Sequence, residues 1–267
     1  MKRISVALLV SVFCFLYAGA QQKIMGFSDE RAADQLTWEK KFDAEIKENT
    51  QDEWMRFITS KPHHLGSPQG KINANYIADL FRSWGYETAI ETYYVLFPTP
   101  KKRVLALLGA KPYKAKLEEL TLREDRTSGQ KSEQLPTYNA YSADGNVTAP
   151  LVFVNRGLPD DYEELRKMGV DVKGKIVIAK YGGSWRGLKP KFAAENGAIG
   201  CLIYSDPLDD GYSVGDVYPE GPFRPGSGVQ RGSVMDWPVQ PADPLTPFIG
   251  ATQSAKRIDR KDAITLM

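Results

Sequence analysis

The sequence predicts an α/β fold with mixed helices and strands, in which helices come first and a layer of alternating strands and helices follows. Two observations carry this prediction. Between residues 28 and 84, apolar residues recur at three- and four-residue spacing, which is typical of amphipathic helices. From Ala149 onward, short apolar runs alternate with short helical patterns, and this order is typical of a compact α/β layer.

The first helical stretch, residues 28–60, is expected to fold in two pieces. Thr50 and Glu53 fit the S/T-x-x-E capping box, which predicts that the second piece begins there. A further helix is predicted over residues 69–84, with Gly85 as its C-cap. The apolar residues of the first two pieces form a stripe that predicts a face buried in a core: Trp38, Phe42, Ile46, Trp54, Phe57 and Ile58.

Strands are predicted after this helical part. Residues 87–97 alternate in character and predict a strand that ends at Pro98, and residues 104–108 predict another. Residues 211–250 are heavy in Gly, Pro and aromatic residues, which favours a functional or covering loop. From Ala149 the elements are predicted in this order: strand 151–154, helix 160–168, strand 175–180, helix 189–196 and strand 199–204.

Residues 1–20 predict an export signal. Two basic residues precede the almost wholly apolar residues 4–16, and Ala18-Gly19-Ala20 matches a cleavage site. A membrane anchor is the alternative, but a bilayer span needs about 20 apolar residues and this run is shorter. We therefore expect a mature chain that starts at Gln21, is secreted or periplasmic, and has no membrane partner.

The mature chain is expected to be formally neutral. The whole sequence has 35 Lys and Arg against 33 Asp and Glu, and cleavage would remove Lys2 and Arg3. Because no excess of positive charge remains, nucleic acid is not expected as a partner. Cys14 would leave with the signal, so no internal disulfide is expected. The remaining Cys201 lies in the apolar run 199–204, which predicts a structural thiol rather than a nucleophile.

The sequence offers few residues for a zinc site. It has only two histidines, His63 and His64. Zinc sites take at least three protein ligands, and paired histidines on a helix are spaced four apart. A packing role in a loop is therefore favoured for this pair. The carboxylates of residues 206–220 lack the spacing of a calcium-binding loop, which favours a solvated loop over a calcium site.

Six short motifs follow one another along the chain. They are Pro62–Ser67, Gly174–Gly182, Trp185–Gly187, Ala193–Asp206, Gly228–Gly232 and Asp243–Pro247. Together they resemble a protease-associated (PA) domain and its surroundings. More narrowly, they resemble the version found in the glutamate carboxypeptidase II, N-acetylated alpha-linked acidic dipeptidase and transferrin receptor-like family of zinc metallopeptidases. The resemblance covers nearly the whole mature chain, from about Phe42 to about Arg260.

The resemblance implies an architecture. Residues 21–97 would be the first helical and strand piece of a zinc aminopeptidase-like domain, and residues 98–267 would be a PA-type apical α/β layer, truncated at its C-terminal end. In the family, the residues that complete the sites of two zinc ions and a structural calcium lie further along the sequence. The catalytic Glu and the homodimerisation domain also lie there. No catalytic residue and no bound metal ion is therefore expected in this chain alone, and the homodimer would form through a domain missing from it.

The resemblance also implies a function. The chain would be the exported N-terminal part of a zinc-dependent carboxypeptidase- or aminopeptidase-like metallopeptidase, whose substrates are peptides. It would supply elements of the substrate cleft, with residues 211–250 as a lid, and would have no peptidase activity by itself. Two alternatives stay open: a non-catalytic PA-domain module that binds proteins, and an incomplete gene sequence.

Three residues can be carried over from the family one by one. Arg186 matches an arginine that reaches the C-terminal carboxylate side of the substrate, and a planar guanidinium pairs well with a carboxylate. Solvating or capping a helix start is the alternative role for Arg186. Ser233 stands where glutamate-type members have a substrate-binding Asn, so glutamate specificity is not implied. Thr246, with Ile249 as its companion, matches a position whose main-chain carbonyl binds the structural calcium.

Overall fold

The computed structural model describes residues 24–235 and 242–263. The predicted export signal, residues 1–20, lies outside these ranges. Contacts divide the chain into two compact units, with the division between Ser60 and Lys61. The predicted boundaries after residues 20 and 97 stay predictions. Within the described ranges, no helix combines the length and the apolar character that a membrane span requires.

The first unit consists of two helices, α2 (Asp29–Glu45) and α3 (Glu48–Ile58), so the two-piece prediction is confirmed. The side chain of Ser28 caps α2. The predicted capping box of α3 is wrong, because this helix begins at Glu48. Thr50 already lies in its first turn, where its main-chain N–H donates to the carbonyl oxygen of Lys47 at 3.1 Å.

Most of the apolar stripe of the first unit is exposed, contrary to the prediction, and only Trp54 and Ile58 are half-buried. Trp38 and Phe42 keep 66% and 68% of their surface exposed, and Ile46 and Phe57 are also exposed. Among the described residues of this unit, only Ala32 is buried. The physical reason is area: two short helices have too little surface of their own to cover several large apolar side chains.

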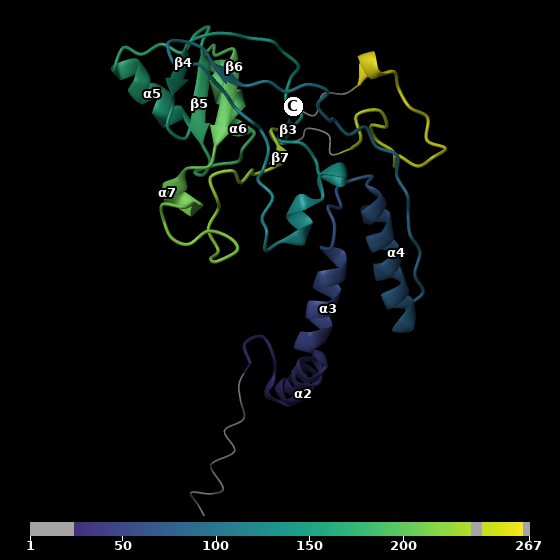
Figure 1. The fold of residues 1–267 in the computed structure, drawn as a ribbon. Helices are drawn as coiled ribbons and strands as arrows, with labels where there is room; N and C mark the ends of the chain where they lie inside the picture. The colour runs from purple at the N-terminus through teal and green to yellow at the C-terminus, as the bar shows by residue number, and fades with distance from the viewer. Residues whose placement is uncertain (1–23, 236–241, 264–267) are drawn as a thin grey trace, which may run out of the picture. The chain divides into compact units, whose positions relative to one another are not determined.

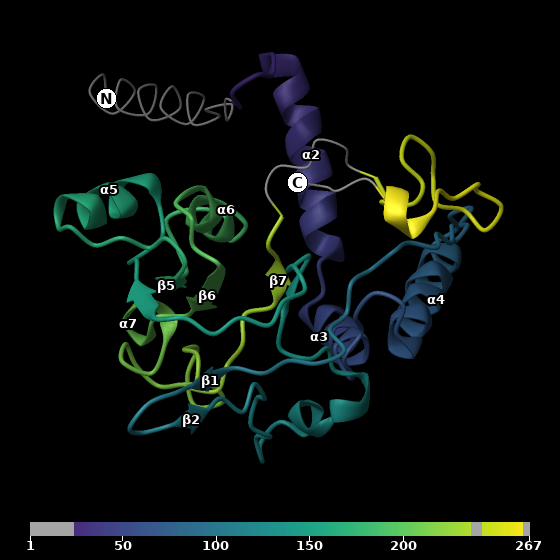
Figure 2. The same ribbon diagram turned by 90° about the horizontal axis from the view of Figure 1, so that it is seen from above.

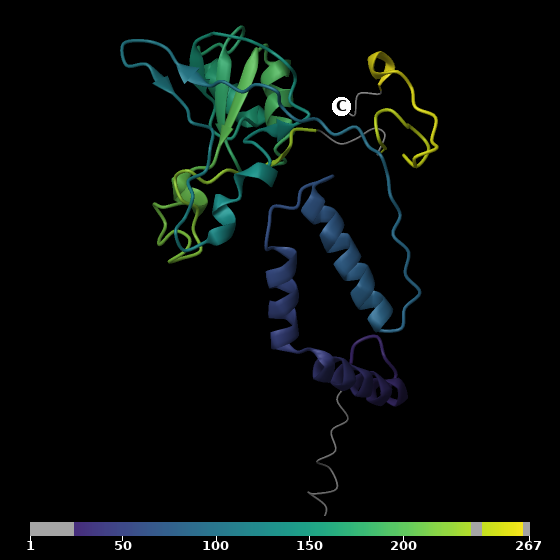
Figure 3. The ribbon, with the colours of Figure 1, turned by 45° about the vertical axis from the view of Figure 1, so that its right-hand side comes forward.

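The second unit begins with a helix, α4 (Pro68–Ser83), the lighter blue helix of Figure 3. The helix predicted over residues 69–84 is thus confirmed. Ser67 is its N-cap, and the hydroxyl of this residue accepts a hydrogen bond from the Gly70 N–H at 3.0 Å. Gly85 follows the helix at φ 87°, in the left-handed region that ends helices, so the predicted C-cap is also confirmed.

The strand predicted over residues 87–97 is wrong. This segment is extended, but it forms no regular series of main-chain hydrogen bonds with a second strand. Single oxygen atoms of the segment 243–257 accept hydrogen bonds from it instead. The Tyr94 N–H donates to the carbonyl oxygen of Ala251 at 2.6 Å, and the Leu96 N–H donates to Asp243 Oδ1 at 2.5 Å. Arg257 Nη2 donates in turn to the carbonyl oxygen of Tyr94 at 2.9 Å. Residues 94–96 are therefore tied to the segment 243–257, far along the chain.

A three-stranded parallel sheet forms the centre of the second unit. Its strands run in the order β4 (Leu151–Phe153), β5 (Ile176–Lys180) and β6 (Gly200–Tyr204). The connecting helices are α5 (Pro159–Lys167) and α6 (Leu188–Glu195), and Figures 1 and 2 show both beside the strands. The predicted strand–helix–strand–helix–strand order is confirmed.

The core lies between this sheet and the two helices. Val177 and Ala179 on β5 are fully buried, whereas their neighbours along the strand are only half-buried, so one face of the sheet packs on the helices. The cluster is completed by Val154, Tyr162, Val172 and Ala193. Cys201 is half-buried on β6 and packs against this cluster, which agrees with its predicted structural role.

Smaller elements complete the unit. An antiparallel pair joins β1 (Ala106–Leu107) to β2 (Tyr113–Lys114), and a parallel pair joins β3 (Asn139–Ala140) to β7 (Gly232–Ser233). The segment predicted as a long loop, residues 211–250, holds only β7 and two isolated bridges in its described part. The remaining short helices are η1 (Arg126–Gly129), η2 (Lys131–Glu133), α7 (Pro207–Asp210) and η3 (Arg260–Asp262).

Candidate functional site

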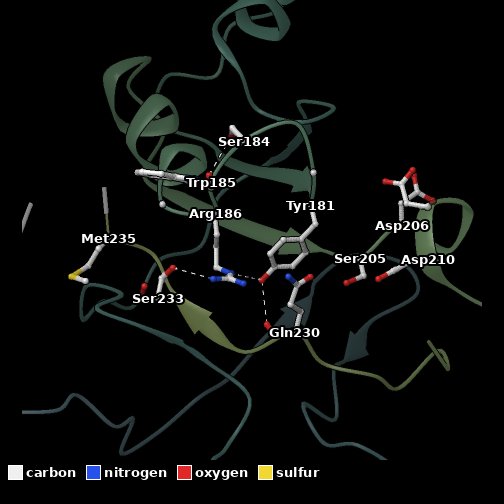
Figure 4. A pocket seen from close by; sticks show the side chains of 13 residues that line it. Tyr181, Ser184, Trp185, Arg186, Ser205, Asp206, Asp210, Gln230, Ser233 and Met235 are labelled. Carbon is white, nitrogen blue, oxygen red and sulfur yellow. Dashed lines mark hydrogen bonds between the residues drawn. The ribbon is translucent and has the colours of Figure 1, made fainter. Parts of the chain in front are cut away.

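A cavity of about 660 Å³ lies at the carboxyl ends of β5 and β6. Ligands of parallel α/β sheets characteristically bind at this end of the strands. Residues from three segments line it: the connection from β5 to α6, the turn after β6 together with the short helix α7, and the segment around β7. Those with side chains labelled in Figure 4 are Tyr181, Ser184, Trp185, Arg186, Ser205, Asp206, Asp210, Gln230, Ser233 and Met235.

The turn after β5 depends on two consecutive glycines. Gly182 and Gly183 have φ values of 92° and 75°, in the left-handed region that other residues rarely adopt. This turn carries the chain from the end of the sheet back to α6. It thereby places Arg186 at the wall of the cavity, two residues before the helix.

The guanidinium of Arg186 is held by neutral groups only. Its Nε donates to the Tyr181 hydroxyl at 3.1 Å, and its Nη1 donates to the main-chain oxygen of Ser233 at 3.4 Å. Its central carbon lies 5.3 Å from the centre of the Tyr181 ring. Among the described residues Arg186 forms no ion pair. Figure 4 shows these contacts from within the cavity.

The structure brings two of the predicted site residues together. Ser233 lies on β7 and lines the same cavity as Arg186, and its main-chain oxygen contacts the arginine directly. The predicted roles of both residues in substrate binding stay predictions. The alternative for Arg186, solvating or capping a helix start, also stays open. Its side-chain hydrogen bonds reach Tyr181 and β7, whereas its main-chain oxygen accepts from the Lys189 N–H in the first turn of α6 at 3.2 Å.

Three carboxylates also line this cavity, on Asp206, Asp209 and Asp210. The Asp206 pKa lies below its usual range, first because the Leu208 N–H donates to its carboxylate and then because of Lys180. Each carboxylate already has a cationic partner: Lys180 for Asp206 at 3.4 Å, Arg156 for Asp209 at 3.8 Å, and Arg224 for Asp210 at 2.8 Å. The predicted preference for a loop over a calcium site fits these pairings.

Thr246 lies outside this cavity, in a turn organised by Asp243. Its hydroxyl donates to Asp243 Oδ2 at 3.0 Å, and its main-chain oxygen accepts from the Ile249 N–H at 3.4 Å. The same carboxylate also accepts from the Leu96 and Leu245 N–H groups. Calcium takes six to eight oxygen ligands. The Asp243 carboxylate already accepts three hydrogen bonds and could not supply six to eight ligands by itself. The calcium role of Thr246 stays a prediction.

His63 and His64 do not fit a zinc site. The Nδ1 atom of each contacts a main-chain oxygen, that of Lys61 at 3.0 Å and that of Leu65 at 2.8 Å. Within residues 24–235 and 242–263, no group of three or more His, Cys, Asp or Glu side chains could hold a metal ion.

Two residues of the site were missed by sequence reasoning. Tyr181 lies within the motif Gly174–Gly182, but its contact with Arg186 has no local sequence signal. Lys189 is fully buried in α6, where its Nζ donates to the carbonyl oxygens of Arg156 at 2.7 Å and of Gly182 at 3.0 Å. Burial, and then the charge of Arg156, lowers the pKa of Lys189. Its position four residues before Ala193, on the buried face of α6, was the available signal.

Comparison with known proteins supports the assignment of this region. The family model of the PA domain matches residues 147–237. The chain is 41% identical over 203 residues to a "Probable glutamate carboxypeptidase" of Arthroderma benhamiae, which covers 74% of this chain and 28% of that protein. It is 30% identical over 256 residues to a "Glutamate carboxypeptidase 2 homolog" of Caenorhabditis elegans, covering 91% of this chain and 33% of the relative.

A third relative bears a different name. "Aminopeptidase NAALADL1" of Rattus norvegicus is 38% identical over 141 residues, which is 51% of this chain and 18% of that protein. The chain thus spans a third or less of the length of each of these relatives. The printed names of these relatives are those of carboxypeptidases and an aminopeptidase. The α/β fold of residues 151–204 agrees with the match to the PA-domain model. Residues 147–237 are a PA domain, and the chain corresponds to the PA-domain portion of the glutamate carboxypeptidase II-like family.

Proposed function

We propose that this chain is the PA-domain part of an exported peptidase, and that it forms one wall of the substrate cleft. The similarity to carboxypeptidases and an aminopeptidase supports the reaction class. The export signal that the sequence predicts over residues 1–20 supports a secreted or periplasmic location. The observation that carries the proposal is the cavity of about 660 Å³ with Arg186 on its wall, where this arginine has no ion-pair partner among the described residues.

The chemistry of Arg186 suits the carboxylate of a peptide. A guanidinium has five N–H donors, and the recorded hydrogen bonds use only one on Nε and one on Nη1. Three donors therefore remain for a ligand. A carboxylate accepts two parallel N–H bonds from a guanidinium, and such charged bonds are stronger than neutral ones. Ser233, beside Arg186, is the proposed second contact with the substrate.

Binding of a peptide acid tests the proposal. We expect the purified chain to bind N-acetyl-dialanine at least about tenfold more tightly than the C-terminal amide of the same peptide, because a hydrogen bond to a charged group contributes roughly 1.5–3 kcal/mol. Titration followed by NMR measures both affinities. Arg186→Ala should abolish the difference. Arg166→Ala, which removes an equal charge from an exposed position on α5, should preserve it. Equal affinity of the native chain for acid and amide would contradict the proposal.

Hydrolysis is assigned to residues outside this chain. We propose that two zinc ions, the structural calcium and the homodimer contacts of the family belong to the remainder of a longer protein. The purified chain with added zinc should hydrolyse a panel of peptides no faster than the same sample with a chelator. Zinc-dependent hydrolysis above that control, retained on repurification, would show that the chain carries a metal site of its own.

A further inference from the structure

We infer that Tyr181 is a positioning residue, which holds the guanidinium of Arg186 in place for a ligand, and that Gly232 leaves the space this requires. The inference rests on the proposed function, in which Arg186 binds a carboxylate. The inference extends that proposal to two further residues, Tyr181 and Gly232, which fix the position of the guanidinium. Neither of them need touch the substrate.

The hydroxyl of Tyr181 joins Arg186 to a second segment. It accepts the Nε–H of Arg186 at 3.1 Å, and it donates its own hydrogen to the carbonyl oxygen of Gln230 at 3.2 Å. Because a phenol has one hydrogen, donating to Gln230 leaves its oxygen lone pairs for Arg186. The guanidinium also lies over the Tyr181 ring, with 5.3 Å between its central carbon and the ring centre, which adds a cation–π contact.

Gly232 contacts the same guanidinium from β7. A Cβ atom at this position would overlap Nη1 and the central carbon of Arg186. The backbone of Gly232 is not in the left-handed region, so the glycine is required for space and not for its φ angle. Its neighbour Ser233 accepts the hydrogen bond from Nη1. Arg186 is thus fixed by the Tyr181 hydroxyl, the Tyr181 ring and the backbone of β7.

Fixing a long side chain in advance strengthens binding. An arginine that is free in solution must give up rotamer freedom when it binds a ligand, whereas one already held gives up less. Loss of this preorganisation should weaken binding of the peptide acid about fivefold. The amide should be unaffected, because it draws little on the guanidinium charge.

Two variants and two matched controls test the inference. Tyr181→Phe removes one oxygen atom and keeps the ring. Gly232→Ala displaces only the end of a flexible side chain, so the fold should tolerate it. Tyr212→Phe changes a tyrosine that lines a neighbouring cavity of about 430 Å³. Gly226→Ala meets only ordinary contacts with the Tyr212 ring. We expect both test variants, and neither control, to lower the affinity for N-acetyl-dialanine about fivefold.

A second readout separates the two ideas. The Arg186 Nε–H should give a slowly exchanging signal in the native chain by 15N NMR, and Tyr181→Phe should make its exchange fast. If the native chain fails to prefer acid over amide, the proposed function fails, yet the Nε–H signal still shows whether Tyr181 holds Arg186. Unchanged exchange and unchanged affinity in Tyr181→Phe would overturn the positioning role. Should Gly232→Ala unfold the chain, Tyr181→Phe alone decides.

Discussion

Replacing Lys189 by alanine should lower the free energy of unfolding of the PA core by about 3 kcal/mol, the largest effect expected of any single change here. Two losses add up. The side chain is fully buried, so its removal leaves a void beside the sheet. The carbonyl oxygens of Arg156 and Gly182 also lose the donor that joins them. These two carbonyls belong to the turns after β4 and β5, so the site should loosen as well.

Two variants divide this effect. Lys189→Met keeps most of the buried volume and loses only the hydrogen bonds, so it should cost roughly 1–3 kcal/mol. Lys167→Ala removes a lysine from an exposed position on α5 and should change stability by less than about 0.5 kcal/mol. Hydrogen exchange of the Val177 and Ala179 amides on β5 measures opening of this core alone. Exchange in Lys189→Ala that matches Lys167→Ala would contradict the prediction.

Alkaline pH should destabilise the same core through Cys201. Burial raises the pKa of this thiol from 9.0 to about 11. The folded state therefore keeps the proton over a range in which the unfolded state releases it. The stabilisation is complete below pH 9 and is lost as the pH rises through 11. Two pKa units correspond to on the order of 2–3 kcal/mol.

Comparison with Cys201→Ala isolates the thiol from other groups. The pKa of Tyr162 is also raised above its ordinary value of 10.0 by burial, so ionisation of this phenol in the unfolded state acts in the same direction above about pH 10. Lys189 acts in the opposite direction, because its lowered pKa makes the folded state bind fewer protons. Urea unfolding from pH 8 to 11 in the presence of a reductant should show native stability falling more steeply than that of Cys201→Ala. Parallel curves for the two proteins would show that the thiol does not ionise on unfolding.

Local sequence patterns were enough to predict the sheet and its helices. The runs at 151–154, 175–180 and 199–204 are apolar, short and separated by helical patterns. A parallel sheet with helices packed on it is the structure that buries the apolar faces of both the strands and the helices. Residues 87–97 have an alternating pattern of comparable clarity but form no strand. An alternating pattern indicates which side chains would share a face of a strand. It does not indicate whether a second strand lies beside the segment to form the hydrogen bonds of a sheet.

The site was predictable only in part, for a similar reason. Only the resemblance to the glutamate carboxypeptidase II family points to Arg186 and Ser233 as site residues, and the structure places both of them on one cavity. Their contact joins positions 47 residues apart, and the bond from Tyr181 to Gln230 spans 49. Such long-range contacts depend on how loops return to the sheet. The burial of Lys189 was missed because a lysine at the start of a helix is usually solvated.

The hydrogen bond from Leu96 to Asp243 has a consequence for how such chains evolve. The Leu96 nitrogen lies 2.5 Å from Asp243 Oδ1, so two positions that flank the segment with the cavity lie side by side. Closing a long loop adds little entropic cost with length, and segments whose two ends meet are readily exchanged between proteins. The contact between Leu96 and Asp243 therefore lets the sequence between them change in length or content while the chain on either side keeps its path.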